Sequence, residues 1–115
     1  MKWYHSYYDY RWLYFLQIAT GAIPNETIQE HAAGTIVSFL DIHPKSPGHT
    51  LMIPKKHYRW FLDMPRDEYE ELMHAAREHA QVLKDEYGAE YVQVGIAGDE
   101  VPHVHIHLIP RGKAS

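Results

Sequence analysis

A strict alternation of histidine and apolar residues near the end of the chain constrains the fold more than any other feature. In the run PHVHIHLIPR, the histidines His103, His105 and His107 are separated by Val104 and Ile106. Successive side chains of a β-strand point to opposite faces of a sheet, so the three histidines share one face and the apolar residues the other. The run predicts a strand whose apolar face packs on a core while its histidines face a cleft or solvent.

Three interpretations of this histidine row differ in their chemistry. In the first interpretation, the histidines are ordinary outward-facing residues of the strand, although histidine has no special preference for strands. A metal site is the second, but His103 and His107 would stand about 13 Å apart along a strand, whereas metal–nitrogen bonds are only about 2.1 Å. Two neighbours and a distant ligand could still bind one ion. In the third, neighbours about 6.7 Å apart lie along an anionic substrate, where one imidazole attacks phosphorus and another contacts its oxygens.

The other patterns predict strands interrupted by one long helix, which is typical of an α+β fold with an antiparallel sheet. The predicted elements are a helix over Tyr10–Thr20, a hairpin of Thr27–Glu30 and Gly34–Asp41, a strand in HTLMIPK, a helix that Asp63-Met64-Pro65 begins and Gly88 ends, and a hairpin of Tyr91–Ala97 and His103–Ile109. The long helix has an apolar stripe with the i, i+3, i+4, i+7 spacing of one buried face, formed by Tyr69, Leu72, Met73, Ala76, Ala80, Leu83 and Tyr87. His74 and His79 fall outside this stripe, so we expect both to be exposed to solvent.

Composition narrows the possible functions. The 115 residues suffice for one compact domain, and their 45% hydrophobic content is that of a globular protein. A formal net charge of -4 disfavours binding to nucleic acid, and the absence of cysteine excludes disulfides, thiolate zinc sites and thiol nucleophiles. No apolar run is long enough to span a membrane, and no signal peptide is evident. We therefore expect a cytoplasmic protein.

The Tyr- and Trp-rich N-terminus is interpreted as packing on the domain or on a partner subunit. The alternative is a patch that stacks on bases or binds a membrane surface.

Three motifs together resemble the histidine triad (HIT) family. The segments IATGAIP, SFLDIHPKSPGHTLMIPKKH and HVHIHLIPR occur in the order and at the spacing of that family, over most of Phe15–Arg111. Residues 1–12 have no evident counterpart and form an aromatic extension. The resemblance implies a single domain over 1–115 with a HIT-like α+β fold, in which five antiparallel strands carry two helices and a second copy completes a homodimer. It is similar to the nucleoside phosphoramidase-like, or Hint-type, branch.

The resemblance also implies an activity at the α-phosphate of a purine nucleotide conjugate, which is a phosphoramidate, an ester or an anhydride. At the matching positions, His105 is the expected nucleophile and forms a covalent nucleotidyl-histidine. His107 is expected to contact the phosphate, His103 to orient His105, and His49, in PGH, to be a further active-site histidine. No metal and no cofactor are required. His49 has the alternative of an ordinary loop residue, and His57, in PKKHY, is interpreted as structural.

The nucleotide-binding positions that the resemblance implies are Asp41, which would accept hydrogen bonds from ribose hydroxyls, Ile42 against the nucleoside, and Gly98, Asp99 and Glu100 in the turn before the triad. A carboxylate suits two adjacent hydroxyls. Asp41 could instead simply end a strand. Asp99 and Glu100 replace the neutral Gln and Ser/Thr of the family, and an ionised carboxylate about 4 Å from a phosphate is repelled by about 4 kcal/mol at an effective dielectric near 20. They therefore point away, pair with a cation, bind a proton, or serve a different leaving group, such as an amine.

A second departure from the family concerns a structural zinc. Many bacterial members hold this zinc with a Cys-x-x-Cys pair and two histidines, but Leu13 and Leu16 occupy the thiol positions here. We therefore expect no such zinc. Two alternative functions remain open: a nucleotide-binding HIT protein with weak or lost catalysis, and a metal-binding module that uses His103 and His105.

Overall fold

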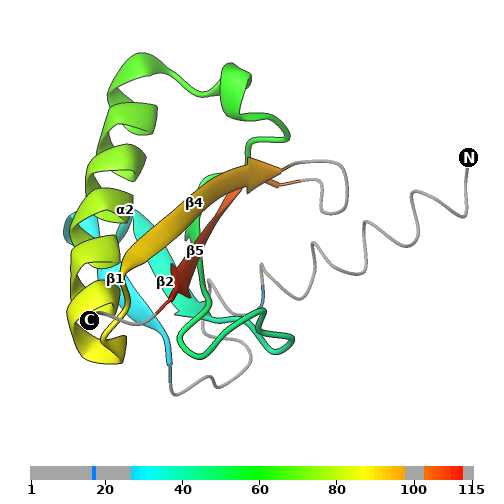
Figure 1. Ribbon diagram of the computed structural model, residues 1–115. Coiled ribbons are helices and arrows are strands. Elements are labelled where there is room, and N and C mark those ends of the chain that lie inside the picture. The colour runs from blue at the N-terminus through cyan, green and yellow to red at the C-terminus, as the bar shows by residue number, and fades with distance from the viewer. Residues whose placement is uncertain (1–16, 18–26, 98–102, 113–115) are drawn as a thin grey trace, which may run out of the picture.

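A five-stranded antiparallel sheet with one long helix along it forms the framework of the protein (Figure 1). The computed structural model describes residues 17, 27–97 and 103–112. The strands are β1 (Gln29–His31), β2 (Ile36–Leu40), β3 (Thr50–Pro54), β4 (Tyr91–Ala97) and β5 (His105–Arg111), in the spatial order β1-β2-β3-β5-β4. The helix α2 spans Arg66–Tyr87, and two 3-10 turns cover Ala32–Gly34 and Phe61–Asp63. The predicted α+β class with a five-stranded antiparallel sheet is confirmed, while the helix expected over Tyr10–Thr20 lies outside the described residues, apart from Gln17.

The histidine-rich strand β5 lies between β3 and β4, with hydrogen-bonded neighbours on both sides. His107 pairs with Leu51 of β3 and with Gly95 of β4, so its backbone is fixed from two directions. Ile106 and Leu108 are fully buried in the core on the side of α2, as the alternation predicts. The regular strand begins two residues later than expected, at His105 rather than His103.

Helix α2 begins and ends where the sequence places its signals. Pro65 precedes the first helical residue, and Asp67 and Glu68 lie in the first turn, where the helix dipole favours negative charge. Gly88 adopts a left-handed conformation with φ of 62°, and the N–H of Ala89 donates to the carbonyl of Lys84 at 3.0 Å. The glycine thus ends the helix by the common left-handed cap. No helix in the described part of the chain is both long and apolar enough to span a membrane.

The buried face of α2 differs from the predicted stripe, and the prediction that His79 is exposed is wrong. The face consists of Leu72, Ala75, Ala76, His79 and Leu83. His79 is only 6% exposed and packs edge to face against the ring of His31 in β1, with ring centroids 5.1 Å apart. Met73 and Tyr87, in contrast, are 37% and 39% exposed. His74 is exposed, as expected. The helix presents a slightly rotated face because the first strand of the sheet covers its His79 flank.

The turn before β3 requires glycine. Gly48 has a φ of +89°, and a Cβ atom at this position would lie 2.6 Å from Cε2 of Tyr87 at the end of α2. Such a distance is far below van der Waals contact, and the backbone conformation itself favours glycine. The turn can therefore approach the helix only because residue 48 has no side chain. The next residue in the chain is His49, which directly precedes β3.

Candidate active site

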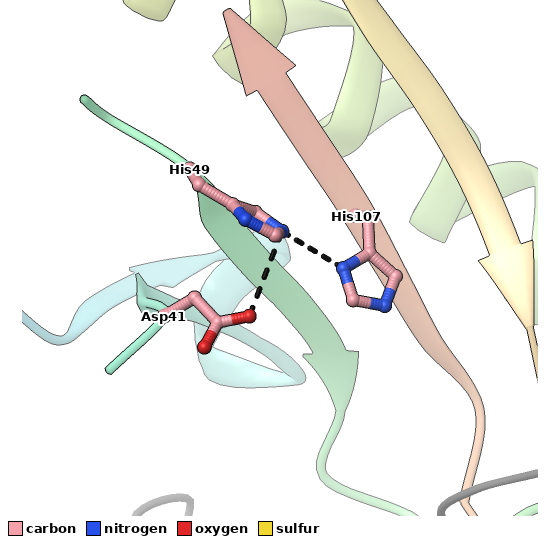
Figure 2. A group of neighbouring side chains, drawn as sticks. All are labelled: Asp41, His49 and His107. Atoms are coloured by element: carbon pink, nitrogen blue, oxygen red, sulfur yellow. Dashed lines mark hydrogen bonds and ion pairs between the residues drawn. The ribbon is translucent and has the colours of Figure 1, made fainter. Parts of the chain in front are cut away.

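Three of the predicted site residues meet at one end of the sheet, although they come from different segments (Figure 2). Asp41 directly follows β2, His49 directly precedes β3, and His107 lies in β5. The Nε2 atom of His49 is 2.9 Å from Nδ1 of His107 and 3.6 Å from Oδ2 of Asp41. The backbone N–H of Asp41 also donates to the carbonyl of His49 at 2.9 Å, which holds the two loop ends together. The FLDI and PGH segments thus converge on the histidine triad.

A directed chain of hydrogen bonds sets the tautomers of His49 and His107. The backbone N–H of Lys45 donates to Nδ1 of His49 at 3.0 Å, so the proton of a neutral His49 must be on Nε2. That proton is donated to Nδ1 of His107, which leaves the proton of a neutral His107 on its own Nε2. His107 therefore offers an N–H donor on the side away from His49.

Both rings of this pair are held in the uncharged form at neutral pH. Burial, followed by the neighbouring rings of His105 and His49, lowers the pKa of His107 to about 4. Burial also lowers the pKa of His49, against the opposing effect of the Asp41 carboxylate. Desolvation disfavours the charged imidazolium more than the single nearby carboxylate favours it. The pair consequently acts through hydrogen bonds rather than through a positive charge.

His105 has the tautomer that a nucleophile needs. Its Nδ1 atom lies 2.8 Å from the backbone carbonyl oxygen of His103, and a carbonyl can only accept, so Nδ1 carries the proton. The lone pair of a neutral ring is then on Nε2. The side chain is only 4% exposed, and its ring lies edge to face against His107 with centroids 5.1 Å apart. A nucleophilic nitrogen and an N–H donor therefore stand side by side.

His103 does not face the cleft, and the expectation of three histidines on one open face is wrong for this residue. Its side chain is fully buried, and its Nε2–H donates to the carbonyl of Pro54 at 2.8 Å. Its Nδ1 is 3.2 Å from Nδ1 of His57 and 3.4 Å from the N–H of Tyr58. Burial lowers its pKa to about 4, despite the hydrogen bond to Pro54. The alternation ends here because the N–H of Val104 donates to the carbonyl of Tyr58, at 2.8 Å, instead of to a neighbouring strand.

Only some of the remaining predicted positions lie within the described residues. Ile42 is next to Asp41 and is 63% exposed, as an apolar surface for a ligand would be. Gly98, Asp99 and Glu100 lie outside the described residues, and so do Leu13, Leu16 and the aromatic extension. His57 contacts His103, 46 positions later, although nothing in the segment PKKHY indicates this contact.

The donor atoms fit a hydrogen-bond network better than a metal. In the part of the chain that the structure describes, Asp41, His49 and His107 are the one group of three potential ligands, with donor atoms within 4.8 Å of one another. A metal would need the Nε2 lone pair of His49, but the Lys45 N–H keeps the proton on that atom. Metal-bound histidines usually donate from their second nitrogen, whereas this one accepts. A structural zinc takes four ligands, and around the His57–His103 pair the described residues form no group of three.

Comparisons with known proteins show which family the sequence and the fold resemble. A model of the HIT domain matches residues 21–114. An uncharacterized HIT-like protein of Methanocaldococcus jannaschii is 41% identical over 101 residues, which cover 84% of this chain and 77% of that protein. The adenosine 5'-monophosphoramidase of Saccharomyces cerevisiae is 41% identical over 75 residues, or 64% of this chain and 48% of that enzyme. The crystal structure of a Hit-like protein from Bartonella henselae superposes with a TM-score of 0.75 at 32% identity, covering 84% of this chain and 78% of that one.

Proposed function

This chain belongs to the HIT family, and we propose that it cleaves or transfers a nucleotide at the α-phosphate of a purine nucleotide conjugate through a covalent intermediate on His105. The family includes nucleotide hydrolases, of which the yeast phosphoramidase is one relative of this chain. The observation that carries the proposal is the Nδ1–H of His105 donating to the His103 carbonyl, because it places the lone pair of the neutral ring on Nε2, beside the N–H donor of His107.

The proposed first step forms a bond between Nε2 of His105 and the α-phosphorus. The bond from phosphorus to the leaving nitrogen or oxygen breaks, and its electron pair leaves with that atom, which takes up a proton from the solvent. The ring of His105 becomes cationic as the bond forms. Its Nδ1–H then donates to the His103 carbonyl from a charged group, and such bonds are stronger than neutral ones. The Nε2–H of His107 is positioned to donate to a phosphate oxygen, where negative charge accumulates.

The proposed second step returns the enzyme to its starting state. Water attacks the phosphorus and releases a proton to the solvent, the nitrogen–phosphorus bond breaks, and its electron pair goes back to Nε2 of His105. Dividing one difficult displacement into two easier ones is the advantage of nucleophilic catalysis. No step needs a metal or a cofactor. An acceptor alcohol or amine in place of water would make the same chemistry a transfer.

Asp41 is proposed to bind the ribose and Ile42 the nucleoside. One oxygen of the Asp41 carboxylate accepts the backbone N–H of His43 at 2.9 Å, and the other lies 3.6 Å from Nε2 of His49. These contacts fix the orientation of the carboxylate and leave it lone pairs for two adjacent hydroxyls.

Asp99 and Glu100 are proposed to affect the choice of leaving group. An Asp99→Gln/Glu100→Ser variant with unchanged turnover of adenosine phosphoramidates and neutral esters would contradict that role.

Trapping the intermediate tests the proposal. Wild-type protein is mixed with adenosine 5'-phosphoramidate, quenched within a turnover, and analysed by mass spectrometry for an adenylyl group on the peptide that contains His105. His105→Ala should abolish the adduct and leave nucleotide binding largely intact, while His74→Ala, at an exposed position of α2, is the matched control. If the wild type binds the nucleotide but never forms an adduct with phosphoramidates, dinucleoside polyphosphates or nucleotide sugars, the chain is a binding protein with lost catalysis. A stoichiometric transition metal in untagged protein would favour the metal-binding alternative.

We also propose that the protein is a homodimer through the free edge of β4. This strand is the last of the sheet and pairs with β5 alone in the described part of the chain. Tyr91, Val94 and Ile96 on it are 54%, 46% and 38% exposed. An edge with unpaired backbone groups and exposed apolar side chains is a template for pairing with a second copy. A cytoplasmic location stays a prediction.

A further inference from the structure

The orientation of the proposed nucleophile depends on one peptide unit, between His103 and Val104. The carbonyl of this unit accepts the Nδ1–H of His105 at 2.8 Å, while its N–H, on the opposite side, donates to the carbonyl of Tyr58 at 2.8 Å. Both groups belong to one plane, because the peptide bond is rigid. Rotation of this plane would turn the carbonyl away from His105 and release the proton of Nδ1. The tautomer of His105 is therefore controlled from the loop that contains Tyr58.

The side chain of His103 anchors the same peptide unit. Its Nε2–H donates to Pro54 at the end of β3, so Nδ1 of the neutral ring is an acceptor buried without exposure to water. Nδ1 of His57 faces this acceptor at 3.2 Å, and the two rings are stacked with centroids 5.2 Å apart. The Tyr58 N–H, at 3.4 Å, is a longer and weaker second donor. His57 thus supplies the shorter hydrogen bond to a buried nitrogen that water does not reach.

We propose that His57 is a positioning residue for His105, and that it acts by holding the ring of His103 and, through it, the His103–Val104 peptide plane. This inference rests on the proposed role of His105 as nucleophile. His57 itself is an exposed residue and does not belong to the triad. A buried acceptor that loses its shorter donor must turn or rely on the longer bond from the Tyr58 N–H, and either change loosens the carbonyl that fixes His105. A neutral or a protonated His57 performs this task equally, since both forms can carry a proton on Nδ1.

Two variants separate the hydrogen bond from the packing. His57→Phe keeps an aromatic ring to stack on His103 but removes the donor. His57→Asn removes the ring but keeps an amide N–H near the position of Nδ1. His74→Phe, the same change at an exposed site of α2, is the matched control. The rate of adenylyl-adduct formation from adenosine 5'-phosphoramidate is measured in single turnovers, together with KM and the thermal unfolding midpoint.

We expect His57→Phe to slow adduct formation about tenfold, the effect of one ordinary hydrogen bond, with KM little changed. His57→Asn should restore the rate to within about threefold of the wild type. A larger loss in His57→Asn than in His57→Phe would show that stacking matters rather than the hydrogen bond, and equal losses would show that the amide N–H restores nothing. Either result would overturn the proposal. A rate for His57→Phe equal to that for His74→Phe would also overturn the positioning role of His57. In each of these cases, adduct formation by the wild type would still support the proposed function.

Nitrogen-15 NMR of the histidine rings provides a test that needs no activity. In the wild type we expect the proton of His105 on Nδ1 and that of His103 on Nε2, each as a single tautomer. In His57→Phe, His105 should become a mixture of tautomers, and in His57→Asn the single tautomer should return. If the wild type formed no adduct, the proposed function would fail while this measurement would still decide the positioning. If His57→Phe did not fold, the wild-type and His57→Asn tautomers would decide it. One zinc per chain in the wild type, lost in His57→Phe, would overturn the hydrogen-bond account.

Discussion

Mild acid should destabilise this protein through His103, and the size of the effect follows from its burial. Burial lowers the pKa of His103 to about 4, against 6.5 for an ordinary histidine. Between these values the unfolded chain binds a proton at this position that the folded chain does not. The contribution of neutral His103 to the free energy of unfolding is therefore complete above pH 6.5, the pKa in the unfolded chain. It is lost as the pH falls toward about 4, the pKa in the folded chain. From pH 7 to pH 5 the linkage for this one residue amounts to about 2 kcal/mol.

A non-titrating variant isolates this contribution. In His103→Gln the side-chain amide can still donate to the Pro54 carbonyl, but it cannot take up a proton. Urea unfolding at pH 7 and pH 5, followed by tryptophan fluorescence, gives the free energy of unfolding at each pH, and most carboxyl groups remain ionised at pH 5. Between these pH values the variant should lose about 2 kcal/mol less stability than His74→Gln, a matched change on the helix surface. The pKa values of His49 and His107 do not depend on His103, so their contributions are the same in both variants and cancel. Equal losses in both variants would refute the assignment of a neutral, buried His103.

Further variants test the turn, the site and the dimer. Gly48→Ala should cost about 2 kcal/mol in urea unfolding, because its Cβ meets the Tyr87 ring, whereas Gly95→Ala, with open space around it, should stay within about 0.5 kcal/mol; equal costs would contradict the crowding. His49→Phe removes the donor to His107 and should lower kcat about tenfold in phosphoramidate turnover. Asp41→Asn should weaken AMP binding, measured by calorimetry, about tenfold; unchanged affinity would remove this residue from the ribose site. Val94→Lys should convert a dimer into monomers in analytical ultracentrifugation, and a wild-type monomer would rule the β4 interface out.

The sequence predicts those parts of the fold that local patterns determine. The alternation around Ile106 and Leu108 places both in the core, because a strand has a period of two whatever surrounds it. Pro65 and Gly88 mark the ends of α2 through their own backbone preferences. These features need no knowledge of distant residues.

His79 and His103 show where local patterns are insufficient. A helix stripe has two flanks, and only the tertiary contact with His31 of β1 decides that the His79 flank is covered. His103 obeys the period of two in the sequence, but Tyr58, 46 residues before Val104, accepts the N–H of Val104 and takes this part of the chain out of the strand. Neither contact leaves a trace in the spacing of the histidines. The convergence of Asp41 and His49 with the triad was accessible only through the family resemblance, since the two segments are separated in the sequence.

The chemistry of the site is set by backbone groups more than by side chains. The Lys45 N–H places the proton of His49, the Pro54 carbonyl that of His103, and the His103 carbonyl that of His105. Any residue other than proline offers the same N–H at position 45, so the lysine side chain is not needed for the tautomer of His49. The path of the chain, rather than the identity of each neighbour, thus decides which nitrogen has a lone pair and which is a donor. A row of histidines in a sequence therefore specifies a reactive centre only together with the loops that direct its protons.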